Sequence, residues 1–141
     1  MEIIIKNLQK KIPINPKRIK KAILKVCSLE GKKSGEINIC FVNDKKIREL
    51  NYRYLGKDYP TDVIAFDMSG KAATLQADIA ISTDTAVSNA KAFDTTPAYE
   101  LYLYLVHGLL HLLGYDDRSA KQRKLMEQRA NSILRTLNID R

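Results

Sequence analysis

His107 and His111 are the only histidines in the chain, and they stand four residues apart in an otherwise apolar segment. On an α-helix, residues four apart lie one turn apart on the same face, so both imidazoles can point at one metal ion. Gly114 predicts the end of this helix, because glycine adopts the left-handed conformation at low cost. The turned chain then brings Asp117 within reach as a third ligand. Two nitrogens and a carboxylate leave one coordination position open, which is typical of a catalytic zinc site.

The same segment bears on which metal chemistry is possible. In zinc proteases the residue after the first histidine is a glutamate that acts as general base. Here that residue is Gly108, which disfavours peptide hydrolysis. A set of two histidines and one carboxylate can also accept iron(II) or manganese, so the residues leave the metal open between these ions and zinc. Iron-dependent oxygen chemistry usually uses such a set on a β-barrel rather than on one helix.

The elements that position this motif follow from capping signals and hydrophobic periodicity. Helices are predicted to begin at Asn15-Pro16, Asn43, Thr96-Pro97 and Ser119. Alternating or apolar runs predict strands at 3–6, 36–42, 63–66 and 78–81. We therefore expect one α+β domain covering residues 1–141, with a small mixed sheet of about four strands packed by about five helices. The all-round hydrophobicity of the histidine helix makes it the central helix, with its C-terminal end facing a cleft.

The chain carries a formal net charge of +8, with 24 Lys and Arg against 16 Asp and Glu. A polyanionic partner is one explanation, and lysines that merely solvate helix faces are the other. Basic residues cluster in an early segment and again directly after the metal motif, where they would suit a phosphate backbone. The clusters are Lys10, Lys11, Lys17, Arg18, Lys20, Lys21 and Lys25, and then Arg118, Lys121, Arg123, Lys124 and Arg129.

Cysteine use and hydropathy indicate the compartment. Cys27 and Cys40 stand alone without CxxC spacing, which fits reduced, buried thiols. The longest uncharged apolar run, 101–115, is shorter than the roughly 18 residues that a membrane span requires. The first residues do not have the pattern of a secretory signal. We expect a cytoplasmic protein without a membrane partner.

A second segment, LN...GKDxPTDVxxF at 50–66, adds specificity to the motif HGxLHLxGYD at 107–116. With the element xDIxIS that ends at Ser82, these motifs resemble the YbeY family of rRNA-maturation metallo-endoribonucleases over nearly the whole chain. The resemblance implies a cytoplasmic, single-strand-specific, metal-dependent endoribonuclease that acts in 3′-end maturation of small-subunit (16S) rRNA and in ribosome quality control. It also implies one zinc ion held by three histidines, and it implies single-stranded rRNA, the ribosomal small subunit and assembly factors as partners.

The chain departs from this family at the third histidine, whose place is taken by Asp117. His107 and His111 therefore carry over as metal ligands, while Asp117 does so by chemical analogy. Because carboxylate is a normal ligand of zinc, iron(II) and manganese, the cofactor is expected to be one zinc ion, with iron(II) or manganese as alternatives.

A second departure concerns an arginine that the family places before the glycine of GKD, where this chain has Leu55. Arg53 is a candidate catalytic replacement and Lys57 a candidate RNA-binding residue. On a helix, Arg53 projects about 200° away from position 55, so its substitution for the family arginine would require a turned segment.

The leading hypothesis is thus a single-strand-specific endoribonuclease for rRNA. The alternative is a metal-stabilised RNA- or ribosome-binding assembly factor with weak or no nuclease activity. The nucleophile stays open between water and the 2′-hydroxyl of RNA. Asp116 either orients a metal ligand or accepts backbone hydrogen bonds in the turn after Gly114.

Overall fold

Short polar side chains begin the helices, because each accepts a hydrogen bond from a backbone N–H group that lacks a partner inside the helix. In the computed structural model, which describes residues 1–70 and 74–141, Asn15 and Thr96 accept from N–H groups three residues on, at 3.2 and 3.0 Å. Ser119 and Gln122 form the predicted reciprocal capping box. The elements are β1 (Glu2–Asn7), α1 (Pro16–Leu29), β2 (Gly35–Val42), α2 (Asp44–Leu55), β3 (Val63–Asp67), β4 (Leu75–Ser82), α3 (Thr83–Phe93), α4 (Pro97–Leu112) and α5 (Ala120–Thr136).

The four strands form one mixed sheet in the order β1-β2-β4-β3. β1 and β4 both run parallel to β2, whereas β3 runs antiparallel to β4. One row of paired residues, Ile5, Ile39, Ile79 and Ala65, crosses all four strands. Because side chains alternate along a strand, this row lies on a single face of the sheet.

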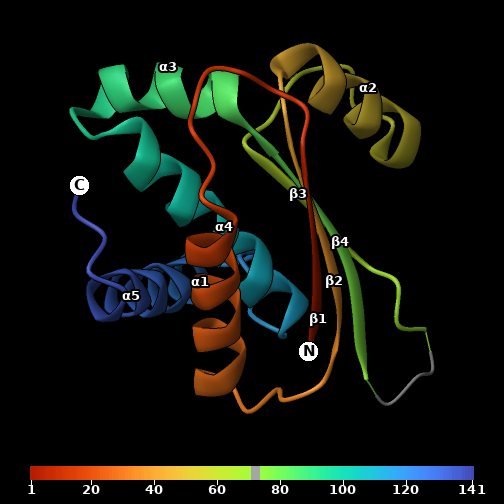
Figure 1. Ribbon diagram of the computed structural model, residues 1–141, viewed down its shortest axis with the longest axis vertical. Helices are drawn as coiled ribbons and strands as arrows, with labels where there is room; N and C mark the ends of the chain where they lie inside the picture. The colour runs from red at the N-terminus through yellow and green to blue at the C-terminus, as the bar shows by residue number, and fades with distance from the viewer. Residues whose placement is uncertain (71–73) are drawn as a thin grey trace.

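The two faces of the sheet are covered by different helices (Figure 1). The face that carries Ile39 and Ile79 belongs to the main hydrophobic core, together with buried side chains of α1, α4 and α5. The other face carries Ile64 and Ala80, which form a smaller core with Ile47 of α2. The sheet therefore separates α2 from α1 and α4.

The histidine helix, α4, is the central helix of the main core, as predicted. It packs against β3 and β4 and also against α1, α3 and α5. Leu105, Val106, Leu109 and Leu110 on it have no exposed surface. A helix that is apolar on nearly all sides can be accommodated only where it has neighbours on nearly all sides.

The structure confirms an α+β domain with a mixed sheet of four strands and five helices, and it corrects two details. β4 begins at Leu75 rather than at residue 78. The sequence pattern does not locate α3, because this helix buries only the small side chains of Thr83, Ala86 and Ala90 and so lacks the periodicity of large apolar residues seen in the other helices. Within the described ranges, no helix has both the length and the apolar character needed to cross a bilayer.

Candidate metal centre and histidine cleft

The C-terminal end of α4 turns sharply and brings the segment after it back toward His111. Gly114 has a φ of 104°, in the region that favours glycine, as the sequence predicts. The N–H of Gly114 donates to the carbonyl of His111 at 3.2 Å, and the N–H of Tyr115 donates to that of Leu110 at 3.0 Å. These bonds satisfy carbonyls that the helix end leaves without partners.

This turn places Asp117 beside His111. His111 Nε2 and Asp117 Oδ2 are 3.5 Å apart, and their side chains are 40% and 56% exposed. Two ligand atoms about 2.1 Å from a tetrahedral zinc ion lie about 3.4 Å from each other. The separation and the donor chemistry of this pair therefore fit two adjacent ligands of one divalent ion.

His107 lies one turn earlier on α4 and lines the same cleft as His111 and Asp117. Burial lowers the pKa of His107 below its ordinary value of 6.5, although the charge of Asp62 acts in the opposite direction. The imidazole is therefore neutral at neutral pH, and a neutral imidazole is the form that binds a metal. Within the described ranges, no three His, Cys, Asp or Glu side chains are grouped closely enough to hold a metal ion. Convergence of all three predicted ligands on one ion thus stays a prediction.

The three predicted ligands line a cavity of about 650 Å³, which we call the histidine cleft. Residues of α3, α4 and α5 line it, together with Asp62 before β3 and Arg141 at the C-terminus. Its charged lining residues, apart from the histidines, are Asp62, Glu100, Asp117, Glu127, Arg123 and Arg141. The cleft therefore combines candidate metal ligands with cations able to contact an anionic substrate.

Arg123 is the cation most directly tied to the candidate metal centre. Its Nη1 donates a hydrogen bond to the backbone carbonyl of Asp117 at 3.1 Å. Arg141 reaches the cleft from the far end of the chain, with its guanidinium 5.8 Å from the ring centroid of Tyr99. The sequence places Arg123 only in a basic cluster, and nothing in the sequence around Arg141 indicates that it approaches the histidines.

Arg53 and Lys57 are not brought to the histidine cleft. Arg53 lies in the last turn of α2, and Lys57 follows Gly56, which ends that helix with a φ of 69°. Both side chains are exposed, and neither lines the cleft. Because α2 is helical through Leu55, Arg53 points about 200° around the helix axis from that position.

Asp116 and Gly108 make contacts that support the fold of this region. Asp116 Oδ1 accepts the N–H of Asp117 at 2.8 Å, and Asp116 Oδ2 lies 3.2 Å from the Nε of Arg118. This is the turn role that the sequence left open for Asp116. Gly108 is buried against β3 and β4, so the position of the glutamate in zinc proteases here faces the sheet.

Comparisons with known proteins agree with this fold and show the family of the chain. The profile of the family described as "Endoribonuclease YbeY" matches residues 4–138. Relatives named "Endoribonuclease YbeY" include one from Syntrophus aciditrophicus, 40% identical over 124 residues, with 84% of this chain and 78% of the relative covered. Another, from Chloroherpeton thalassium, is 35% identical over 135 residues, with 96% and 94% covered. A solution structure of a Thermotoga maritima protein shares the fold, with a TM-score of 0.64, 24% identity and coverage of 96% and 91%.

The α+β fold and the family matches define a ribonuclease, and therefore a hydrolase. The chain belongs to the endoribonuclease YbeY family. This membership confirms the resemblance found in the motifs. It favours a nuclease over a binding factor without activity, and it gives no support to peptide hydrolysis or to oxygen chemistry.

Proposed function

We propose that this endoribonuclease cleaves single-stranded rRNA in 3′-end maturation of the small ribosomal subunit and in ribosome quality control. The observation that carries the proposal is the histidine cleft, in which His107, His111, Asp117 and Arg123 line one cavity in a chain of this family. Its partners would be the small subunit and assembly factors, in the cytoplasm. The whole chain from residue 1 to residue 141 would act as one catalytic domain.

We infer that His107, His111 and Asp117 hold one divalent ion, with zinc favoured and iron(II) or manganese as alternatives. A bound divalent ion supplies Lewis acidity toward a phosphoryl oxygen and lowers the pKa of water. Burial of His107 keeps that imidazole neutral and able to act as a ligand. The hydrogen bond that the N–H of Asp117 donates to Asp116 Oδ1 fixes the backbone that carries the third ligand.

Arg123 is suited to bind the phosphodiester that is cleaved. Its guanidinium is fixed beside Asp117 by the bond to that residue's carbonyl, and it keeps further N–H donors for phosphate oxygens. Arg53 belongs to α2, which packs on the face of the sheet opposite α4, and Lys57 follows that helix. Neither residue lines the histidine cleft, so we assign them no contact with the reacting phosphate. Contact of either residue with a more distant part of the RNA stays a prediction.

The test is cleavage of a single-stranded RNA that contains the 3′ region of small-subunit rRNA, free and within immature subunits. Zinc-loaded protein is compared with His111→Ala and with Lys124→Ala, an exposed control outside the cleft. We expect cleavage by the wild type and the control, and none by His111→Ala at unchanged fold. Equal cleavage by all three proteins would indicate a contaminating RNase. Absence of cleavage by all, even in subunits, would replace the enzyme with the metal-stabilised binding factor.

A further inference from the structure

A second hollow lies on the opposite side of the C-terminal residues from the histidine cleft. This cavity of about 700 Å³, the α1 groove, is formed by α1, by Tyr102 of α4 and by the end of α5 with the residues that follow it. Five cationic side chains of α1 line the groove, and all five residues are exposed: Lys17, Arg18, Lys20, Lys21 and Lys25. No carboxylate is among its lining residues, and none of the five cations forms an ion pair with any described residue.

The histidine cleft has the opposite balance of charge. Four carboxylates and two arginines line it, so these side chains carry a formal charge of −2, and the divalent ion proposed for the cleft would only bring this charge to zero. A polyanion such as RNA is bound mainly through contacts of cations with its phosphates. The cleft by itself therefore offers little affinity for an RNA strand, and the main attraction must come from cations outside it.

The α1 groove and the histidine cleft are neighbours. Leu137 and Ile139 line the groove, while Arg141, two residues further on, lines the cleft. On α4, Tyr102 borders the groove and Tyr99, three residues earlier, borders the cleft. The last residues of the chain thus separate the two hollows, and one extended RNA strand can pass over them from one hollow to the other.

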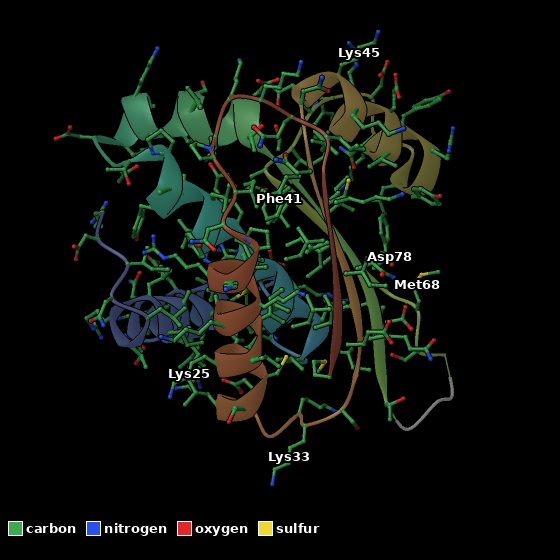
Figure 2. The ribbon with its side chains drawn as sticks, viewed as in Figure 1. Lys25, Lys33, Phe41, Lys45, Met68 and Asp78 are labelled. Carbon is green, nitrogen blue, oxygen red and sulfur yellow. The ribbon has the colours of Figure 1, made fainter. Side chains whose placement is uncertain are left out.

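The groove differs from a helix face whose lysines only contact water. Its floor contains apolar surface from Leu24, Tyr102 and Ile139. Arg18 is held against this floor, with its guanidinium carbon 5.1 Å from the ring centroid of Tyr102. Figure 2 shows Lys25 on the side of α1 turned away from the sheet. Cations around a partly apolar hollow match a single strand, whose phosphates are anionic and whose bases have apolar faces.

We propose that the α1 groove binds the phosphate backbone of the same RNA strand whose reacting phosphodiester lies in the histidine cleft. The groove supplies the binding charge that the cleft lacks, so RNA long enough to reach it is the preferred substrate. This inference rests on the proposed function, because it takes RNA as the substrate of the cleft.

The test compares two double variants that each remove two adjacent lysines from an exposed helix surface. Lys20→Gln with Lys21→Gln alters the groove, and Lys45→Gln with Lys46→Gln alters α2, where Lys45 lies at the opposite end of the molecule from Lys25 (Figure 2). Glutamine keeps the helix propensity of lysine, and equal thermal unfolding of both variants checks the fold. Binding of fluorescent single-stranded RNAs of about 4 and about 16 nucleotides is measured in EDTA by anisotropy. Cleavage of the same RNAs by zinc-loaded protein is measured in parallel.

We expect the groove variant to bind the longer RNA about tenfold more weakly at about 0.1 M salt, because it loses contacts with phosphates. The slope of log affinity against log salt concentration should also become shallower by about 0.7 for each lost contact. The KM for the longer RNA rises accordingly, and the preference for it over the shorter RNA is lost. The α2 variant keeps wild-type affinity and salt slope. Equal affinity of the two variants for the longer RNA would overturn the proposal.

Two further outcomes separate this proposal from the proposed function. If no protein cleaves RNA but the groove variant alone binds the longer RNA weakly, the groove assignment stands and the proposed nuclease function fails. If polyglutamate of equal charge displaces the longer RNA as well as unlabelled RNA does, the groove is a site for an acidic protein and the RNA assignment is overturned.

Discussion

Gly108 of α4 packs directly on Val63 of β3. A Cβ atom at position 108 would lie 3.2 Å from Val63 Cγ2, and within 4 Å of side-chain atoms of Ile79 and Ala65. The residue after the first histidine therefore faces the sheet, while His107 itself lines the cleft. A glutamate at this position would be buried in the hydrophobic core, which explains physically why the zinc-protease arrangement does not fit this chain.

Replacement of Gly108 by valine is predicted to lower the free energy of unfolding by about 1–3 kcal/mol, because three added carbon atoms meet a packed interface. Gly108→Ala adds only a Cβ and gains helix propensity of about 1 kcal/mol, so its loss should be smaller. Urea denaturation of both variants measures the difference. An unchanged midpoint for Gly108→Val would mean that α4 and β3 are not in the described contact.

Asp117 is predicted to set the metal preference. Asp117→His should retain metal and shift selectivity from manganese toward zinc, because imidazole is a softer donor than carboxylate. Asp117→Ala should bind metal much more weakly, since it leaves only two histidines. Equilibrium competition between zinc and manganese, with metal content measured by mass spectrometry, distinguishes these cases. Lys124→Ala is the control, and metal content equal to wild type in Asp117→Ala would remove Asp117 from the ligand set.

The local part of the candidate site could be predicted from sequence alone. The i, i+4 spacing of His107 and His111 and the stop at Gly114 specify one helix face and one turn, and the structure has both. Asp62 and Arg141 reach the same cleft from a strand start and the C-terminus. Their approach depends on the packing of elements distant in sequence, which no local pattern encodes.

The fold shows the same division between local and long-range information. Caps such as Asn15 and Thr96 marked helix starts correctly, because a cap is a bond within three residues. α3 had the signal of a cap at Ser82 followed by Ala86 and Ala90 at helical spacing, yet small residues give weak periodicity. The strand order β1-β2-β4-β3 could not be predicted from the alternation of apolar and polar residues. Alternation shows which face of a strand is buried, but not which strand lies beside it.

Arg123→Ala is predicted to lower kcat/KM for RNA on the order of 10²-fold, because it removes a fixed donor near the reacting phosphate. Arg123→Lys should recover only part of this activity, since an ammonium group lacks the bidentate geometry of guanidinium. Lys124→Ala, at an exposed neighbouring position outside the cleft lining, should leave kcat/KM unchanged. Steady-state kinetics on one RNA substrate compare the three variants. A loss in Lys124→Ala equal to that in Arg123→Ala would point to general electrostatics rather than to a phosphate contact.

Asp84 is predicted to make the stability of the chain dependent on acidic pH. Its carboxylate accepts the N–H of Asp44 at 2.8 Å and lies 2.7 Å from Nζ of Lys11, so it joins the starts of α2 and α3 to the segment before α1. The bond from Asp44, followed by that from Lys11, holds the pKa of Asp84 below its ordinary value of 3.8. Because the unfolded chain binds this proton more readily, the stabilisation is complete above the unfolded pKa and is lost as pH falls through the folded pKa.

At neutral pH, Asp84→Asn should therefore be less stable than the wild type by about 1.5–3 kcal/mol, the usual size of a hydrogen bond to a charged group. The difference should shrink as the pH falls below about 4, because the carboxylate of the unfolded chain is protonated there first and that of the folded chain only at lower pH. Urea denaturation at a series of pH values measures both curves, with exposed Asp140→Asn as the control. A difference between wild type and Asp84→Asn that stays constant down to about pH 2 would show that Asp84 stabilises these helix starts by packing and not by its charge.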